Sequence, residues 1–122
     1  MIQDANLVVL QKMLDASTLR HRAIAQNLAN VETPGYRRRV VRFQERLAEA
    51  LAAGRGDRVA AARPEVSIVE TGVNPMTDNN VEPDAELAAM MENALLYRTC
   101  SQLLSARIAG YRAAITGQAL RG

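Results

Sequence analysis

Residues 29–36, with the sequence ANVETPGY, constrain the fold more than any other part of this 122-residue chain. Pro34 has no N–H group and a fixed φ, and it pushes Thr33 into an extended conformation. Gly35 supplies the positive φ that the third position of a type II turn requires, and Asn30 is suited to a left-handed helix cap just before the turn. The string therefore predicts that a helix stops here and that the chain reverses.

From about Asp4 to Ala29, apolar residues recur at the spacing of an amphipathic helix. The main stripe consists of Leu7, Leu10, Leu14, Ile24, Leu28 and Val31, with Ser17 and His21 at the seam positions between them. A second stripe, which widens the apolar face, consists of Val9, Met13 and Ala16. These patterns predict a helix of roughly 26 residues, about 39 Å long, that can contact more than one neighbour.

The clearest element is the last one, which begins near Asp84, a residue suited to a helix N-cap. Nine residues follow with gaps that alternate between three and four, and eight of them are apolar: Leu87, Met90, Ala94, Tyr97, Ser101, Leu104, Ile108, Tyr111 and Ile115. This seam extends over about four heptads. Further apolar surface lies beside it, at Met91, Leu95, Leu96, Cys100 and Leu103. A single partner helix would therefore not cover all of the apolar surface.

The middle of the chain has weaker patterns. Residues 44–53 favour a short helix closed by Gly54, and residues 55–62 are small and charged, which predicts a mobile segment. Residues 64–72 alternate weakly and predict a short extended segment, and turn residues gather within 74–80.

Only four aromatic side chains are available to fill a core, whereas alanine, leucine and arginine are abundant, as in long helices that pack along narrow seams. We therefore expect a mainly α, elongated fold. Two long terminal helices should pack antiparallel as a coiled-coil-like hairpin, joined by a short irregular middle segment. The expected units are an N-terminal helix over 1–33, a turn, short helix and linker over 34–83, and a C-terminal helix over 84–122.

The net charge is only +2, but the charge is segregated along the chain. It amounts to +4 over residues 1–46, −6 over residues 47–97 and +4 over residues 98–122. Such segregation suits a subunit whose ends and middle meet different neighbours, and solvated faces without partners produce similar blocks.

The sequence carries little that points to catalytic or metal-binding chemistry. One histidine and one cysteine cannot form a structural zinc site on their own, and the chain contains no glycine-rich phosphate loop. Asp15, Ser17 and His21 could form a nucleophilic set, but they share one helix, with no third element to orient them and no oxyanion donor. We therefore expect no enzyme activity and no cofactor.

Cys100 is the only cysteine, which excludes an intrachain disulfide, and its place in an apolar stripe predicts a buried free thiol. The N-terminus lacks the basic start, apolar core and cleavage site of a secretory signal. No apolar run approaches the roughly 20 residues needed to span a bilayer. Composition alone therefore predicts a cytosolic protein without a membrane span.

A basic cluster after the turn supports a different class of function. It comprises Arg37, Arg38, Arg39, Arg42 and Arg46, with Tyr36 and Phe43 beside it. Arginine with interleaved aromatic residues is suited to phosphate backbones and bases, but the total charge is low and no nucleic-acid-binding scaffold is recognisable. A peripheral membrane helix is disfavoured because the first helix has few basic residues on its polar face and no tryptophan. A nucleic-acid-binding helical protein is the alternative, and salt-dependent DNA binding would identify it.

Residues 27–37, NLANVETPGYR, resemble the N-terminal signature of the bacterial flagellar rod, hook and hook-filament junction proteins, which is an Ala-Asn pair, two variable residues and then Thr-Pro-Gly-Tyr. The end of the chain, at residues 92–98, 102–105 and 111–115, resembles the C-terminal helix of proximal rod members of this family. The resemblance covers both terminal thirds. One departure is that the Asn-Asn-Val stretch at residues 79–81 lacks the glycine that often precedes it.

The resemblance implies a non-enzymatic structural subunit at the base of the flagellar rod, which packs by its helices and transmits torque from motor to hook. It also implies export without cleavage through the flagellar type III apparatus and assembly on the periplasmic side of the basal body. Implied partners are further copies of the chain, other proximal rod proteins, the adapter FliE, the MS ring and the export gate, with no nucleic acid. The family motif and turn correspond to Ala29, Asn30, Thr33, Pro34, Gly35 and Tyr36. The expected assembly interface comprises Leu7, Leu10, Leu14, Ile24, Leu28, Leu87, Met90, Tyr97, Leu104, Ile108, Tyr111 and Ile115.

Overall fold

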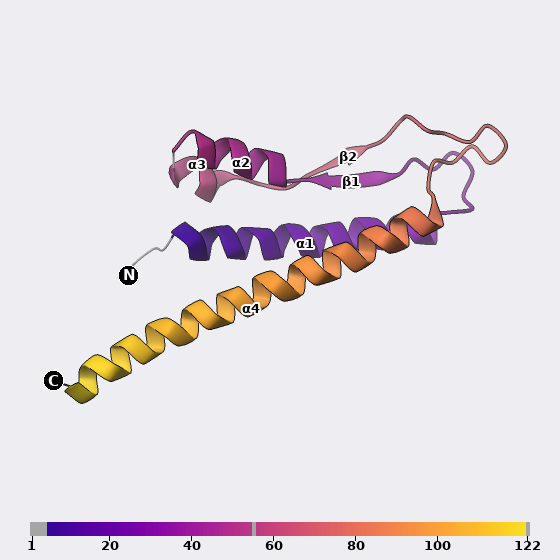
Figure 1. The fold of residues 1–122 in the computed structure, drawn as a ribbon. Coiled ribbons are helices and arrows are strands. Elements are labelled where there is room, and N and C mark those ends of the chain that lie inside the picture. Colours follow the sequence, from indigo (N-terminus) through magenta and orange to yellow (C-terminus); the bar gives the residue numbers. More distant parts are fainter. Residues whose placement is uncertain (1–4, 55, 122) are drawn as a thin grey trace.

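The computed structural model of the chain describes residues 5–54 and 56–121. Its elements follow in the order α1 (Ala5–Ala29), β1 (Arg39–Arg42), α2 (Gln44–Ala52), α3 (Gly56–Ala61), β2 (Glu65–Ile68) and α4 (Pro83–Arg121). Figure 1 shows an elongated molecule in which α1 lies in the middle, with α4 on one side and the strands and short helices on the other. The predicted mainly α hairpin of two terminal helices, joined by a short and mostly irregular middle, is confirmed.

The two long helices run antiparallel, and a buried pair of polar side chains joins them near the middle of α1. Ser17 Oγ donates a hydrogen bond to Asn93 Oδ1 over 3.0 Å, and Asn93 Nδ2 donates to the carbonyl oxygen of Ser17 over 2.8 Å. The Ser17 hydroxyl therefore bonds to α4. Continued along both helices, this register brings Ala5 level with about residue 105, so about 16 residues of α4 extend past the first described turn of α1. Figure 1 shows this extension at the C-terminal end of α4.

The middle segment packs on the other side of α1 and shares a small apolar core with it. The buried members of this core are Ala16, Phe43, Leu47, Ala50 and Val59, and the half-buried residues against them are Val8, Val9, Met13 and Ala62. The second apolar stripe of α1 therefore finds its neighbour within the same chain. Its partner is the pair α2 and α3, not another long helix.

The strands β1 and β2 form a two-stranded antiparallel sheet, with Arg39 opposite Ile68 and Arg42 opposite Glu65. The predicted extended segment within 64–72 is confirmed as β2, and the predicted helix within 44–53 is confirmed as α2. Gly54 follows α2 with φ +67°, a conformation that favours glycine after a helix.

The prediction of a mobile segment over residues 55–62 is wrong where the structure describes it. Residues 56–61 form α3, whose Val59 is buried in the shared core, and Lys12 Nζ donates to the carbonyl oxygen of Ala62 over 3.0 Å. Val59 is buried against a surface that α1 and α2 supply. The prediction failed because the composition of the segment alone does not indicate that this surface is present.

Two predicted helix caps also differ from the structure. Asn30 does not adopt the left-handed conformation, because Asp78 is the one non-glycine residue with positive φ in the described part of the chain. Instead the Asn30 N–H and its side-chain Nδ2 both donate to the carbonyl oxygen of Gln26, over 3.1 and 2.8 Å. α4 begins at Pro83, one residue before the predicted cap Asp84. Proline is favourable in the first position of a helix, because an N–H group there would have no partner within the helix.

Cys100 should react slowly with thiol reagents in the folded chain. Cys100 is 4% exposed, and this burial raises the pKa of its thiol. Less of the reactive thiolate is therefore present at any given pH. At pH 8 the reaction with a disulfide reagent should be at least about tenfold slower in the native protein than in urea. Equal rates in the two conditions would contradict the buried position.

Candidate assembly site

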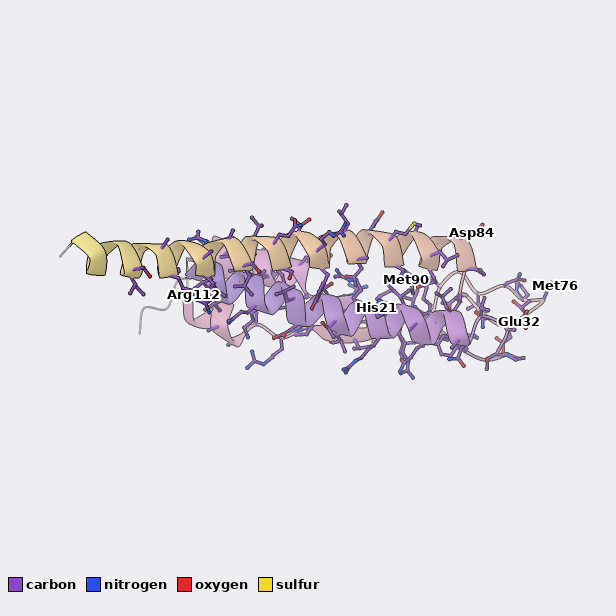
Figure 2. The ribbon with its side chains drawn as sticks, turned by 90° about the horizontal axis from the view of Figure 1, so that it is seen from below. His21, Glu32, Met76, Asp84, Met90 and Arg112 are labelled. Atoms are coloured by element: carbon purple, nitrogen blue, oxygen red, sulfur yellow. The ribbon has the colours of Figure 1, made fainter. Side chains whose placement is uncertain are left out.

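The chain reversal at residues 33–36 is a type II turn, as the sequence predicts. Gly35 has φ +82°, and the Tyr36 N–H donates to the carbonyl oxygen of Thr33 over 3.3 Å. The Gly35 N–H donates to the carbonyl oxygen of Asp78 over 2.8 Å, so the turn is held against a second turn far along the chain. Figure 2 shows this end of the molecule, where Glu32 and Met76 mark the two turns.

The side chain of Asn27 forms the centre of a buried polar network where α1, β1 and α4 meet. Its Oδ1 accepts hydrogen bonds from the Tyr36 hydroxyl and from the Arg39 N–H, each over 2.9 Å. Its Nδ2 donates to the Arg39 carbonyl oxygen over 2.8 Å and to Glu86 Oε2 over 3.1 Å. Burial raises the pKa of the Tyr36 hydroxyl, which keeps it protonated and able to donate. Asn27 thus fixes the strand and the start of α4 to the end of α1.

Two further asparagines hold the loop before α4 against the turn and the strands. Asn79 Nδ2 donates to the carbonyl oxygens of Asn30 and Thr33, over 2.8 and 2.9 Å. Asn80 Oδ1 accepts from the Arg38 N–H over 2.6 Å, and its Nδ2 donates to the Val69 and Thr71 carbonyl oxygens. We call the set Asn27, Tyr36, Asn79, Asn80 and Glu86 the polar junction.

Glu86 is the charged member of the polar junction and is 3% exposed. Its Oε1 pairs with Arg38 Nε over 2.8 Å, while its Oε2 accepts from Asn27. Among the described residues, no buried side-chain nitrogen or oxygen is left without a hydrogen-bond partner. A buried network that is fully satisfied fixes one arrangement, because any shift would leave a polar group without its partner.

Asp78 explains the departure from the family pattern, where a glycine often precedes the Asn-Asn-Val stretch. It adopts φ +50°, a left-handed conformation that aspartate tolerates better than most residues. Its Oδ1 also binds Arg37 Nη2 over 2.7 Å, an ion pair that glycine could not make. The turn therefore keeps the backbone conformation that glycine favours, and it gains an ion pair with Arg37.

Of the polar junction, the sequence predicted Tyr36 as a motif residue but gave no site role to Asn27, Asn79, Asn80 or Glu86. Two signals were available. The first is that asparagine disfavours helix formation, so an asparagine inside a helix indicates that its side chain makes specific hydrogen bonds. The second is that Glu86, Asn93 and Cys100 follow one another at a spacing of seven residues, which places them on one face of α4. All three of these α4 residues are buried.

The predicted apolar seam of α4 lies beside the buried face of this helix and is only partly covered within the chain. Leu87, at its start, is 50% exposed and Ile115, at its end, is 68% exposed, whereas Glu86, Asn93 and Cys100 form the buried face. Of the remaining predicted interface residues, Tyr97, Ile108 and Tyr111 are exposed, Ile24 is buried, and the half-buried ones are Leu7, Leu10, Leu14, Leu28, Met90 and Leu104. Within one chain, α4 therefore packs on α1 through a face that includes Glu86, Asn93 and Cys100, and five of the predicted interface residues of α4 stay exposed.

The outward residues form a continuous stripe. Leu87, Met91 and Leu95, each four residues apart, are 50%, 75% and 66% exposed, and we call these three residues the outer stripe of α4. Figure 2 shows side chains projecting from α4 on the side away from α1. Contiguous apolar surface of this kind marks interaction sites on proteins.

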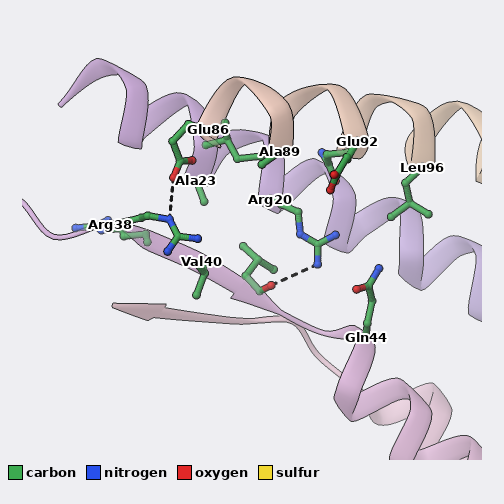
Figure 3. Close-up of a pocket in the computed structure, with 13 residues that line it drawn as sticks. Arg20, Ala23, Arg38, Val40, Gln44, Glu86, Ala89, Glu92 and Leu96 are labelled. Atoms are coloured by element: carbon green, nitrogen blue, oxygen red, sulfur yellow. Dashed lines mark hydrogen bonds and ion pairs between the residues drawn. The ribbon is translucent and has the colours of Figure 1, made fainter. Parts of the chain in front are cut away.

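A groove lies next to the junction, between β1 and α4, with α1 as its floor (Figure 3). Its volume is about 480 Å³, and its walls combine apolar residues such as Val40 and Leu96 with charged ones such as Arg20 and Glu92. The Arg38–Glu86 pair lies at one end. Within residues 5–54 and 56–121, no group of three or more His, Cys, Asp or Glu side chains is placed to hold a metal ion.

The basic cluster of the alternative hypothesis is largely engaged within the chain. Arg37 pairs with Asp78, Arg38 with Glu86, and Arg46 with Glu65. These carboxylates reduce the positive charge that could contact phosphates. None of the helices in the described residues combines the length and apolar character needed to cross a membrane.

Gly35→Val should destabilise the chain by about 2–3 kcal/mol, because a β-branched residue is strained at positive φ. Space is not limiting, since a Cβ at this position would lie 3.8 Å from Asp78 Oδ2. Gly35→Asn, which tolerates the left-handed region, is the matched control and should cost less than about 1 kcal/mol. Urea unfolding followed by circular dichroism measures both. Equal losses for Val and Asn would mean that backbone conformation is not the cause.

The antiparallel helical hairpin and its Thr-Pro-Gly-Tyr turn place the chain in the class of flagellar rod and hook proteins. No family model matches the chain. Among curated proteins it is 33% identical over 108 residues to the flagellar basal body rod protein FlgB of Cereibacter sphaeroides, an alignment that covers 81% of this chain and 84% of that protein. It is also 27% identical over 124 residues to the FlgB protein of Escherichia coli K12, covering 88% and 90%, and 26% identical over 114 residues to that of Borrelia hermsii, covering 79% and 84%. The chain belongs to the family of the flagellar basal body rod protein FlgB.

Proposed function

We propose that the chain is a non-enzymatic structural subunit of the proximal rod, which assembles by helix packing and transmits torque from motor to hook. The observation that carries the proposal is the outer stripe of α4, which is apolar and exposed, while Glu86, Asn93 and Cys100 on the opposite face of the same helix are buried. A helix with this distribution completes its burial against a neighbouring subunit.

Burial of the outer stripe against a neighbouring subunit would contribute several kcal/mol to the free energy of assembly. Full burial of a leucine or methionine side chain contributes about 1.5–3 kcal/mol, and the outer stripe offers several side chains that are half exposed or more. The C-terminal part of α4 adds to it, because Ile108 and Ile115 lie where α4 extends past the described part of α1. We therefore propose that Leu87, Tyr97, Ile108, Tyr111 and Ile115 contact other subunits.

The polar junction suits the transmission of torque. It connects α1, β1 and α4 by hydrogen bonds and one ion pair, so a twist applied to the helices also turns the strands. The half-buried and buried residues of α1, which are Leu7, Leu10, Leu14, Ile24 and Leu28, then support α4 from within the subunit. The motif residues around Pro34 set where the chain leaves the helical layer.

The proposal includes location and partners. The subunit would be exported without cleavage by the flagellar type III apparatus and lie on the periplasmic side of the basal body. Its neighbours would be further copies of itself, other proximal rod proteins, the adapter FliE, the MS ring and the export gate. Support comes from the names of the relatives, all of which are basal body rod proteins.

The test is a deletion of the gene in its own host, followed by complementation. We expect the deletion to abolish swimming and rod assembly, and the chain to copurify with isolated basal bodies when it is restored. Crosslinks from cysteines introduced at Leu95 or Ile115 would identify the neighbours. Normal swimming of the deletion strain would overturn the proposal, and salt-dependent DNA binding by the purified chain would support the nucleic-acid alternative instead.

A further inference from the structure

Within residues 5–54 and 56–121, only one of the two sheet edges is covered by other parts of the chain. The Val69 N–H donates to the Arg38 carbonyl oxygen over 2.8 Å, and in this register the hydrogen-bonded pairs continue at Val40 with Ser67. The alternate residues, Arg39 on β1 and Ile68 on β2, therefore point their backbone groups away from the sheet. On β1 these groups are satisfied, because Asn27 binds both the N–H and the carbonyl oxygen of Arg39.

The outer edge of β2 has no such cover among the described residues. The sheet has two strands, and β2 lies on the far side of β1 from α1 (Figure 1). The outward backbone groups belong to Val66 and Ile68, which are 46% and 56% exposed. Both side chains lie on one face of the strand, since they are two residues apart. An exposed edge of this kind is a template for pairing with another strand.

We propose that this edge pairs with the same edge of a second copy of the chain, antiparallel, about a two-fold axis at Ser67. That register places Val66 opposite Ile68 of the partner, and Ile68 opposite the partner's Val66. Each of the two pairs exchanges two backbone hydrogen bonds. The four β-branched side chains form one apolar cluster on the same face, which is the favourable cross-strand arrangement.

Neighbouring residues select this register. Moving the axis to Val66 would place Ile68 opposite Pro64, which has no N–H to donate. With the axis at Ser67, Glu65 lies opposite Val69 of the partner, so no like charges face one another across the edge. Its carboxylate is also already paired with Arg46 of its own chain.

A two-fold contact closes on itself, whereas a shaft needs contacts that repeat from one subunit to the next. The pairing therefore belongs to free subunits, and it covers an edge that would otherwise invite aggregation. The pairing itself follows from the exposed edge of β2 and would form whether or not the chain is a rod subunit. The contact is small, so it should be a reversible, concentration-dependent dimer.

The first test introduces a cysteine at the axis, as Ser67→Cys in the Cys100→Ser background. Residues at the axis form a pair without backbone hydrogen bonds, with Cα atoms about 4.5 Å apart, within the range of a disulfide. Mild oxidation of the full chain should convert most of the protein to a covalent dimer. Thr71→Cys is the control, because the axis at Ser67 places it away from its own copy, and it should crosslink at least about fivefold more slowly. Equal crosslinking at both positions would overturn the register.

The second test removes a single outward N–H group. Ile68→Pro deletes the donor that faces the second copy and leaves the hydrogen bonds between β1 and β2 intact, whereas Ile68→Thr keeps the donor at similar shape. Sedimentation velocity should show dimer for the parent and for Ile68→Thr, and at least about tenfold weaker dimerisation for Ile68→Pro. Far-ultraviolet circular dichroism verifies that each variant is folded. A parent chain that stays monomeric at high concentration, or a dimer that Ile68→Pro leaves intact, would overturn the proposal.

Discussion

Replacing Asn27 by leucine should lower the free energy of unfolding by about 3–5 kcal/mol, the largest change in stability that we expect for a single substitution in this chain. Leucine has a similar volume but makes none of the four hydrogen bonds of the Asn27 side chain. It would leave the backbone groups of Arg39 and the carboxylate of Glu86 short of partners in a buried site. Urea unfolding and thermal melting, followed by circular dichroism, measure the change.

The matched control is Gln26→Ala, one residue earlier on α1. Gln26 is exposed, and the bond from Arg39 Nη1 to its side chain is long, at 3.4 Å. Its replacement should cost less than about 0.5 kcal/mol. If Asn27→Leu costs no more than the control, the polar junction does not hold the fold together.

Replacing Leu95 by aspartate should abolish swimming while leaving the isolated subunit nearly as stable as the parent. Leu95 is 66% exposed, so in the free chain the new carboxylate stays in water, and the free energy of unfolding should change by less than about 0.5 kcal/mol. In an assembled rod the same carboxylate would lie unpaired in a dry helix contact, which costs several kcal/mol at every copy. Motility in soft agar and recovery of basal bodies, at matched levels of exported protein, measure the effect.

Leu95→Met is the control for this substitution, since it keeps an apolar side chain of similar volume and should leave swimming close to normal. Arg112→Ala removes an exposed charge at the far end of α4 and should also have a small effect. Normal motility of the Leu95→Asp strain would show that the outer stripe is not an assembly contact. A destabilised Leu95→Asp monomer would instead show that Leu95 is covered within the chain.

The sequence was sufficient for the features that depend on neighbouring residues. The stop at residues 33–36 follows from the fixed φ of Pro34 and the positive φ of Gly35, which act within one turn. The lengths of α1 and α4 follow from apolar spacing along each helix. The short helix α2 and the extended segment that contains β2 are local in the same sense, and all of them are present in the structure.

The features that the sequence could not supply all join residues that are far apart along the chain. Asn27 bonds to Glu86, Gly35 to Asp78, and Lys12 to Ala62, and no local pattern pairs these positions. The helix α3 forms because α1 and α2 provide a site for Val59. Apolar spacing shows which face of a helix avoids water but not which neighbour covers it.

The orientation of α4 shows this limit most clearly. Apolar spacing predicted a seam from Leu87 to Ile115 but gave no role to Glu86 and Asn93, which the structure buries together with Cys100, while Leu87, Met91 and Leu95 stay exposed. The sequence by itself determined the helices, the turn and the amount of apolar surface, because these depend on local backbone geometry and side-chain volume. Only the tertiary structure decided which face meets α1, because that choice depends on hydrogen-bond partners brought together from both ends of the chain.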